Sequence, residues 1–75
     1  MMLNRIRIDN LMDLSGIINY ADLAEQLRVD PSQLSRWLAG RQSPNLKSLG
    51  NFVALFSRLT YLKIDIDYLI GDDKK

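Results

Sequence analysis

Residues 20–41, with the sequence YADLAEQLRVDPSQLSRWLAGR, decide the fold of this chain. Leu23, Ala24 and Leu27 fall on one face of a helix, and this spacing predicts a short helix over residues 20–27. About three residues then separate this helix from a second one. Two short helices joined so tightly are typical of a helix-turn-helix, expected here over about residues 20–40.

Asp30 and Pro31 predict where the second helix begins. Aspartate can cap free backbone amides, and proline lacks the amide that the first helical position leaves unpaired. Gln33 has the spacing to reach back to this cap, as in a capping box. Gly40 is a typical stop, so we expect the helix to end at about Ala39. The residues expected on its inward side are Leu34, Trp37 and Leu38.

The contact between these two helices determines which residue types they need. Ala24 must be small, because the helices cross close to it. Leu23 and Val29 must be apolar, because they attach the pair to the rest of the domain. The outward side chains of the second helix then remain free to meet the edges of DNA bases. These side chains are Ser32, Gln33, Ser35, Arg36 and, marginally, Pro31.

On the N-terminal side, residues 3–15 mix apolar and polar positions and predict another helix, which Ser15 and Gly16 close. Asn19 can cap the helix that follows. The motif is therefore preceded by one helix. The apolar residues of this first segment are Leu3, Ile6, Leu11, Met12 and Leu14.

On the C-terminal side, Pro44 and Asn45 introduce a long helix, predicted over about residues 45–62. Two adjacent apolar stripes cover roughly half of its circumference, more than the ~100° that a surface helix needs. Either both stripes are buried within the domain, or the second stripe includes a contact between two copies of the chain. The first stripe is Leu46, Leu49, Val53 and Phe56, and the second is Phe52, Leu55, Leu59 and Leu62.

Residues 61–70 allow two interpretations. Alternating apolar and charged side chains over residues 62–67 are typical of a strand. Asp65 as a cap and Gly71 as a stop instead predict a short helix over about residues 65–70, and we favour the helix. The expected fold is therefore all-α, a compact bundle of about five helices that contains the helix-turn-helix.

Length, charge and composition narrow the function further. The 75 residues fit a single domain, residues 1–75. Residues 28–63 carry six Lys or Arg and one Asp, between flanks that are net acidic, which indicates a surface that faces phosphates. The apolar runs are too short to span a membrane, and no signal-peptide pattern is recognisable, so we expect a cytoplasmic protein.

The composition also excludes several kinds of chemistry. The chain contains no Cys and no His, which removes disulfides, thiolate chemistry, zinc-finger sites and imidazole catalysis. No nucleophile–base pair and no acidic loop with the spacing of a calcium site is evident. We therefore expect no enzyme activity, no cofactor, no metal site and no small-molecule ligand.

Residues 20–41 closely resemble the Cro/CI-type (XRE-like) helix-turn-helix family. The Leu-Ala pair at residues 23–24 is similar to one in the family, and residues 34–36 and 40–41 resemble the end of its second motif helix. Residues 66–71 resemble its short closing helix. The resemblance implies a lambda repressor-like fold and a transcriptional repressor or regulator of bacterial or phage type.

The resemblance also implies partners and roles for individual residues. Such proteins usually bind palindromic double-stranded DNA operators as homodimers, with half-sites about one helical turn apart. The residues expected at bases or nearby phosphates are Ser32, Gln33, Ser35 and Arg36. The residues expected at backbone phosphates are Tyr20, Arg41 and Ser43. The dimer-contact residues come instead from the second apolar stripe of the long helix, and they are Phe52, Leu55, Leu59 and Leu62.

Three departures from the family pattern affect this comparison. Arg28 occupies the turn position where the family favours glycine, so a residue with a side chain must adopt a positive φ or the turn must shift. Leu38 replaces a common glutamate, and Asp13 falls near the position of the first-helix arginine that often pairs with that glutamate. Both halves of the ion pair are therefore absent, which suggests an apolar contact instead. The stretch from Phe56 to Ile64 is about six residues longer than usual, which leaves the dimer geometry open.

Two functions from different classes remain. The first is a DNA-binding regulator, which the Ser, Gln and Arg side chains of the second motif helix favour. The second is a protein-interaction module on the same fold, such as an antitoxin-like or inhibitor protein, whose wide apolar helix holds a partner. The net charge of only +1 favours the second.

Overall fold

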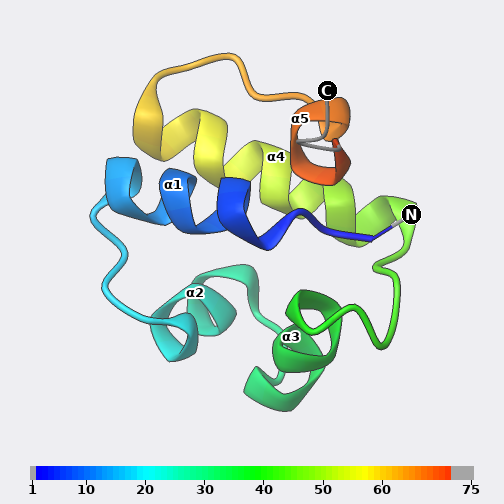
Figure 1. Ribbon diagram of the computed structural model, residues 1–75. Helices are drawn as coiled ribbons and strands as arrows, with labels where there is room; N and C mark the ends of the chain where they lie inside the picture. The colour runs from blue at the N-terminus through cyan, green and yellow to red at the C-terminus, as the bar shows by residue number, and fades with distance from the viewer. Residues whose placement is uncertain (1, 72–75) are drawn as a thin grey trace.

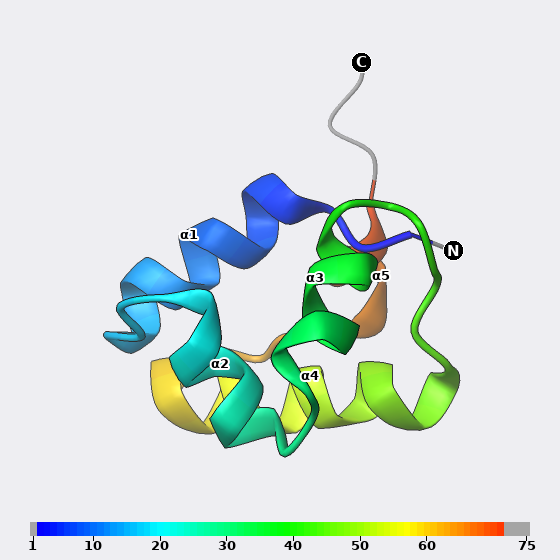
Figure 2. The same cartoon turned by 90° about the horizontal axis from the view of Figure 1, so that it is seen from below.

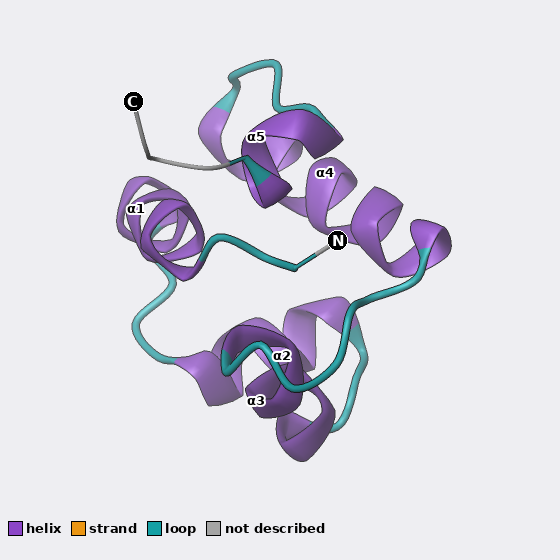
Figure 3. Ribbon diagram, turned by 45° about the vertical axis from the view of Figure 1, so that its right-hand side comes forward, coloured by secondary structure: helices purple, strands orange, loops and turns teal. Residues whose placement is uncertain are grey.

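The computed structural model describes residues 2–71, which form five α-helices and no strand (Figure 1, Figure 3). The helices are α1 (Arg5–Ser15), α2 (Tyr20–Leu27), α3 (Pro31–Leu38), α4 (Leu46–Thr60) and α5 (Ile66–Ile70). In Figure 1, α2 and α3 lie below α1 and α4, and Figure 2 views this pair from below. The all-α fold expected from the sequence is confirmed.

Asparagine and aspartate side chains cap the N-termini of most of these helices. Asn19, for example, accepts a hydrogen bond at 2.8 Å from the backbone N–H of Asp22. Asp30 stands at the cap position of α3, but its side chain makes no capping hydrogen bond, so that expectation is wrong. Pro31 begins α3 instead, because its fixed φ suits the first helical position. The residues that cap with their side chains are Asn4, Asn19, Asn45 and Asp65.

Helix α1 is shorter than expected and buries only some of its apolar residues. It begins at Arg5, although Leu3 is already buried just before it. Ile6 and Leu14, two of the apolar residues of this segment, are each 63% exposed. These two side chains lie outside the face of α1 that packs against α4 and α5. The residues of that face recur every three or four positions, as the helical period requires. The buried residues of α1 are Ile8, Leu11 and Met12.

Helix α4 is the centre of the core, because it contacts α1, α2 and α5. Both of its apolar stripes supply buried side chains, namely Leu49, Phe52, Leu55 and Phe56. The Phe52 ring lies 5.9 Å from the Trp37 ring of α3 and 6.2 Å from the Phe56 ring. Aromatic pairs at such distances add to the free energy gained by burial. The helix-turn-helix thus rests on the middle of α4.

The second stripe does not form one exposed contact surface. Phe52 is fully buried and Leu55 is 5% exposed, so the expected dimer contact through these two residues is wrong. The reason is that neighbouring helices cover α4 from several sides. Leu59 is half-buried against the core. Leu62 lies beyond the end of α4 and is 52% exposed.

Residues 66–70 form a helix, which confirms the favoured interpretation of this segment. Leu69 is fully buried, and the N-terminal segment fixes the helix in place. The backbone N–H of Asn4 donates to the carbonyl oxygen of Leu69 at 2.7 Å. The side-chain amide of Asn4 donates to the carbonyl oxygen of Gly71, also at 2.7 Å. The segment before α1 and the end of α5, which are far apart in the sequence, are therefore hydrogen-bonded to each other.

Candidate functional site

Helices α2 and α3 pack directly on each other and on the core. Ala24 is 1% exposed, and Leu23 and Leu34 are fully buried. Val29, in the connecting turn, is half-buried against the same core. These positions carry the small or apolar residues that the sequence argument requires, so the position of α3 is fixed by packing.

The turn between α2 and α3 places Arg28 in the left-handed conformation, with φ of 62°. The backbone N–H of Arg28 donates to the carbonyl oxygen of Glu25, and that of Val29 donates to the carbonyl oxygen of Ala24. This pair of bonds is a Schellman motif, which usually has glycine at the left-handed residue. Of the two alternatives for Arg28, the positive φ is therefore the one present, and the backbone is strained there because Cβ lies close to the following carbonyl oxygen.

The polar residues of α3 form one outward surface. Ser32, Ser35 and Arg36 are exposed, and Gln33 is half-buried. The opposite side of the same helix is buried through Leu34 and Trp37. The structure thus brings together the four side chains that the sequence predicts for base contacts.

Gln42 joins this surface, although the sequence argument did not identify it. Its Oε1 atom accepts hydrogen bonds from Nε2 of Gln33 at 3.1 Å and from Nε of Arg36 at 3.3 Å. Arg36 also donates from Nη2 to Oε1 of Gln33 at 3.0 Å. These bonds replace the capping-box contact expected of Gln33. The only sequence signal was Gly40, whose stop reverses the chain just before Gln42.

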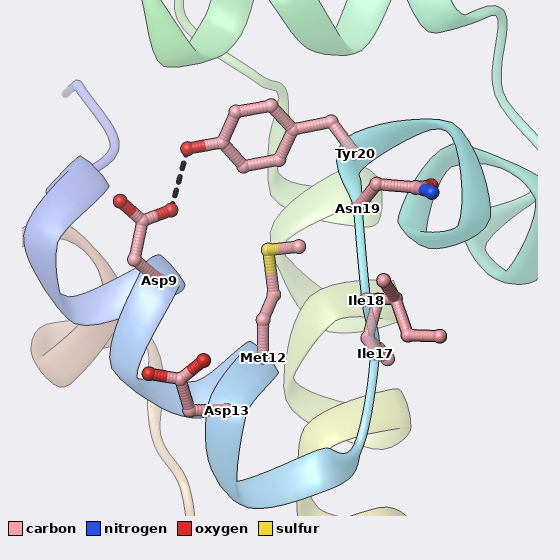
Figure 4. A pocket seen from close by; sticks show the side chains of 7 residues that line it. All are labelled: Asp9, Met12, Asp13, Ile17, Ile18, Asn19 and Tyr20. Carbon is pink, nitrogen blue, oxygen red and sulfur yellow. Dashed lines mark hydrogen bonds between the residues drawn. The ribbon is translucent and has the colours of Figure 1, made fainter.

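Tyr20 is at the start of α2, and its hydroxyl faces α1. The hydroxyl donates to Oδ1 of Asp9 at 2.5 Å, across the pocket shown in Figure 4. Partial burial and then this carboxylate raise the pKa of Tyr20 above its usual value. Because the single hydroxyl hydrogen is given to Asp9, donation to a phosphate requires the hydroxyl to turn away from α1.

Arg41 and Ser43 lie in the loop between α3 and α4, and both are exposed. The Ser43 hydroxyl contacts the Met2 sulfur at 3.4 Å. Arg41 donates its backbone N–H to the carbonyl oxygen of Arg36 at 3.0 Å. The two residues expected at phosphates therefore lie in the loop that directly follows α3.

Residues 11–56, more than half of the 75-residue chain, match the family model described as helix-turn-helix. The match contains α2, the Arg28 turn and α3. The chain belongs to the XRE-like helix-turn-helix family. No curated protein and no solved structure matches the chain.

The XRE-like family consists of DNA-binding regulators. In helix-turn-helix proteins the second helix of the motif typically enters the major groove of DNA. Leu38, which replaces a glutamate common in the family, is half-buried against the core.

Within residues 2–71, no group of carboxylates is arranged to hold a metal ion. In the same range, no helix has the length and apolarity needed to cross a membrane.

Proposed function

We propose that this chain is a sequence-specific regulator of transcription that binds double-stranded DNA with α3 in the major groove. The observation that carries the proposal is the division of α3 into two sides. Leu34 and Trp37 hold the helix on the core, and the polar side chains opposite them are exposed. Arginine can donate two hydrogen bonds to O6 and N7 of guanine, so Arg36 is the principal base contact. The proposed base contacts are Arg36, Ser32, Gln33 and Ser35.

The phosphate contacts come from either side of this helix. Arg41 and Ser43 are exposed in the loop that follows α3, and they would hold one stretch of the DNA backbone. Tyr20 would hold another stretch once its hydroxyl leaves Asp9. Contacts of this kind position a protein on DNA without reading the sequence, whereas the base contacts specify the site.

We further propose a repressor of bacterial or phage type that acts in the cytoplasm and binds a palindromic operator as a homodimer. Leu14 is 63% exposed and Leu62 is 52% exposed, and both line one groove between α1 and the loop before α5. Lys63 and Asp65 line the same groove, so it carries both signs of charge. An apolar surface that also carries a positive and a negative side chain suits a two-fold dimer. In such a dimer the same surface of each protomer contacts its equivalent on the other, so the surface must complement itself.

The dimer is tested by Leu62→Glu. Because Leu62 lies in an exposed loop, the variant should stay folded while losing the contact, and it should bind paired half-sites more weakly. Sedimentation velocity gives the mass and circular dichroism the helix content. Tyr61→Glu is the matched control, since Tyr61 is 93% exposed and does not line the groove. A folded Leu62→Glu variant with the parent's mass would contradict the proposed dimer contact.

The burial of apolar residues of α4 within this chain argues against a protein-interaction module. Phe52 and Leu55 belong to the wide apolar side of the helix that was expected to hold a partner, and both lie in the core of this chain. The match to a DNA-binding family favours the other function. DNA binding is therefore the function that the site supports best.

A salt titration tests DNA binding directly. Affinity for a random-sequence duplex should fall steeply with salt, because phosphate contacts release counterions. Arg41→Ala should weaken binding to all sequences and lower the slope of log affinity against log salt by about one unit. Arg58→Ala removes the same charge from α4, which supplies none of the proposed phosphate contacts, so this control should change the slope little. A flat salt dependence for the parent would contradict the proposed function.

A further inference from the structure

We propose that Gln42 is a positioning residue that holds the Arg36 side chain in the orientation needed to contact guanine. This inference rests on the proposed function of α3. It assigns a role in site preference to a residue of the α3–α4 loop, which needs no contact of its own with a base.

The three side chains form a closed set of hydrogen bonds. Gln42 Oε1 accepts from Gln33 Nε2 at 3.1 Å and from Arg36 Nε at 3.3 Å. Gln33 Oε1 accepts from Arg36 Nη2 at 3.0 Å. Each residue is therefore bonded to both of the others, and Arg36 is held at two points of its guanidinium group.

The backbone brings Gln42 to this position. Gly40 has φ of 76°, its N–H donates to the carbonyl oxygen of Trp37, and the N–H of Arg41 donates to that of Arg36. This is a Schellman motif, which ends α3 and turns the chain back on itself. Gln42 is the next residue and returns beside the outward surface of α3. Its place is thus fixed by the helix end.

The bonds leave the right donors of Arg36 available. A guanidinium group has five N–H donors in a plane. Nε and one hydrogen of Nη2 are used within the set, so both hydrogens of Nη1 and one of Nη2 remain. These form the end of the guanidinium that can meet O6 and N7 of guanine together. A long flexible side chain held in this way loses less freedom when it binds.

Gln42→Met tests the inference, because methionine has a similar length but cannot accept these hydrogen bonds as the amide oxygen does. The parent's preferred site is first selected from a pool of random duplexes. Affinities are then measured for that site, for the site with its Arg36-dependent guanine replaced, and for random DNA. We expect Gln42→Met to reduce the preference for guanine roughly 2–10-fold while leaving the affinity for random DNA unchanged.

Three further variants give the result its meaning. Gln42→Glu keeps an acceptor for Arg36 and should retain the guanine preference, although its charge weakens binding to all DNA. Gln26→Met makes the same change on α2 and should alter nothing. Adding Gln42→Met to Arg36→Ala should have no further effect on preference, because Gln42 acts through Arg36.

The outcomes separate this inference from the proposed function. A parent protein without any preferred site contradicts the proposed function itself. A parent whose preference depends on Arg36 but survives in Gln42→Met overturns only the role of Gln42. An effect of Gln42→Met that persists in the Arg36→Ala background also overturns it, because Gln42 would then contact DNA directly.

Discussion

The two sides of α3 differ in what constrains them, although they belong to one helix of eight residues. On the inward side, Leu34 is fully buried and Trp37 is 5% exposed against Phe52. On the outward side, Ser32 and Arg36 are exposed and contribute little to packing. The inward residues are therefore set by the fold, whereas the outward residues can vary without loss of packing.

This difference explains how so small a domain can carry a specific function. A buried side chain cannot be exchanged without a cavity or a strain in the core. An exposed side chain on a helix can be exchanged at a cost usually within about 0.5 kcal/mol. Substitutions on the two sides should accordingly give opposite patterns of effect on stability and on DNA binding.

The largest effect is expected for Trp37→Ala. Loss of this buried ring should lower the free energy of unfolding by about 3–5 kcal/mol, a large share of the total for a domain of this size. Thermal unfolding followed by circular dichroism measures the change. Trp37→Phe should lose less and retain DNA binding once folded. Unchanged stability of Trp37→Ala would show that the inward side does not hold α3.

Arg36→Ala should show the reverse pattern. We expect a loss of about 1–3 kcal/mol in binding to the preferred site, with relaxed preference at one base, expected to be guanine. Stability should change by less than about 0.5 kcal/mol, because Arg36 is exposed. Fluorescence anisotropy with labelled duplexes measures the binding, with Arg58→Ala as the charge control. Equal affinity and preference in Arg36→Ala would remove this residue from the proposed interface.

The smallest effect concerns the turn that leads into α3. Arg28→Gly should raise the free energy of unfolding by about 0.5–1 kcal/mol. Glycine relieves about 1–2 kcal/mol of left-handed strain, which exceeds the roughly 0.4–1 kcal/mol lost to the greater freedom of the unfolded chain. Chemical denaturation measures this gain. Lower stability would mean that the Arg28 side chain makes contacts worth more than its strain.

Local signals in the sequence predicted most of the fold. The α2 bounds, the start of α3 at Pro31 and the short helix near Asp65 all follow from cap, proline and spacing rules that act within a few residues. The positive φ of Arg28 is one of the two alternatives that follow from the family's preference for glycine at this position. These features need no knowledge of distant parts of the chain.

Apart from the Asp30 cap, the errors concern contacts that the local sequence does not determine. An apolar stripe shows that Phe52 must be covered, but it does not show whether another helix or another copy covers it. In the structure the other helices do so, because α4 is the central element. The bond from Tyr20 to Asp9 likewise joins residues 11 positions apart on different helices. Gln42 was missed because its partners depend on the path of the chain after Gly40.

The most direct test of the central claim is selection of duplexes bound by the parent protein from a random pool. If the outward side of α3 reads DNA in a two-fold dimer, the selected sequences will share a symmetric site with half-sites about one helical turn apart. The same selection with Arg36→Ala will lose the preference at one position in each half-site. A pool that shows no enriched sequence with the folded parent protein would contradict sequence recognition by α3.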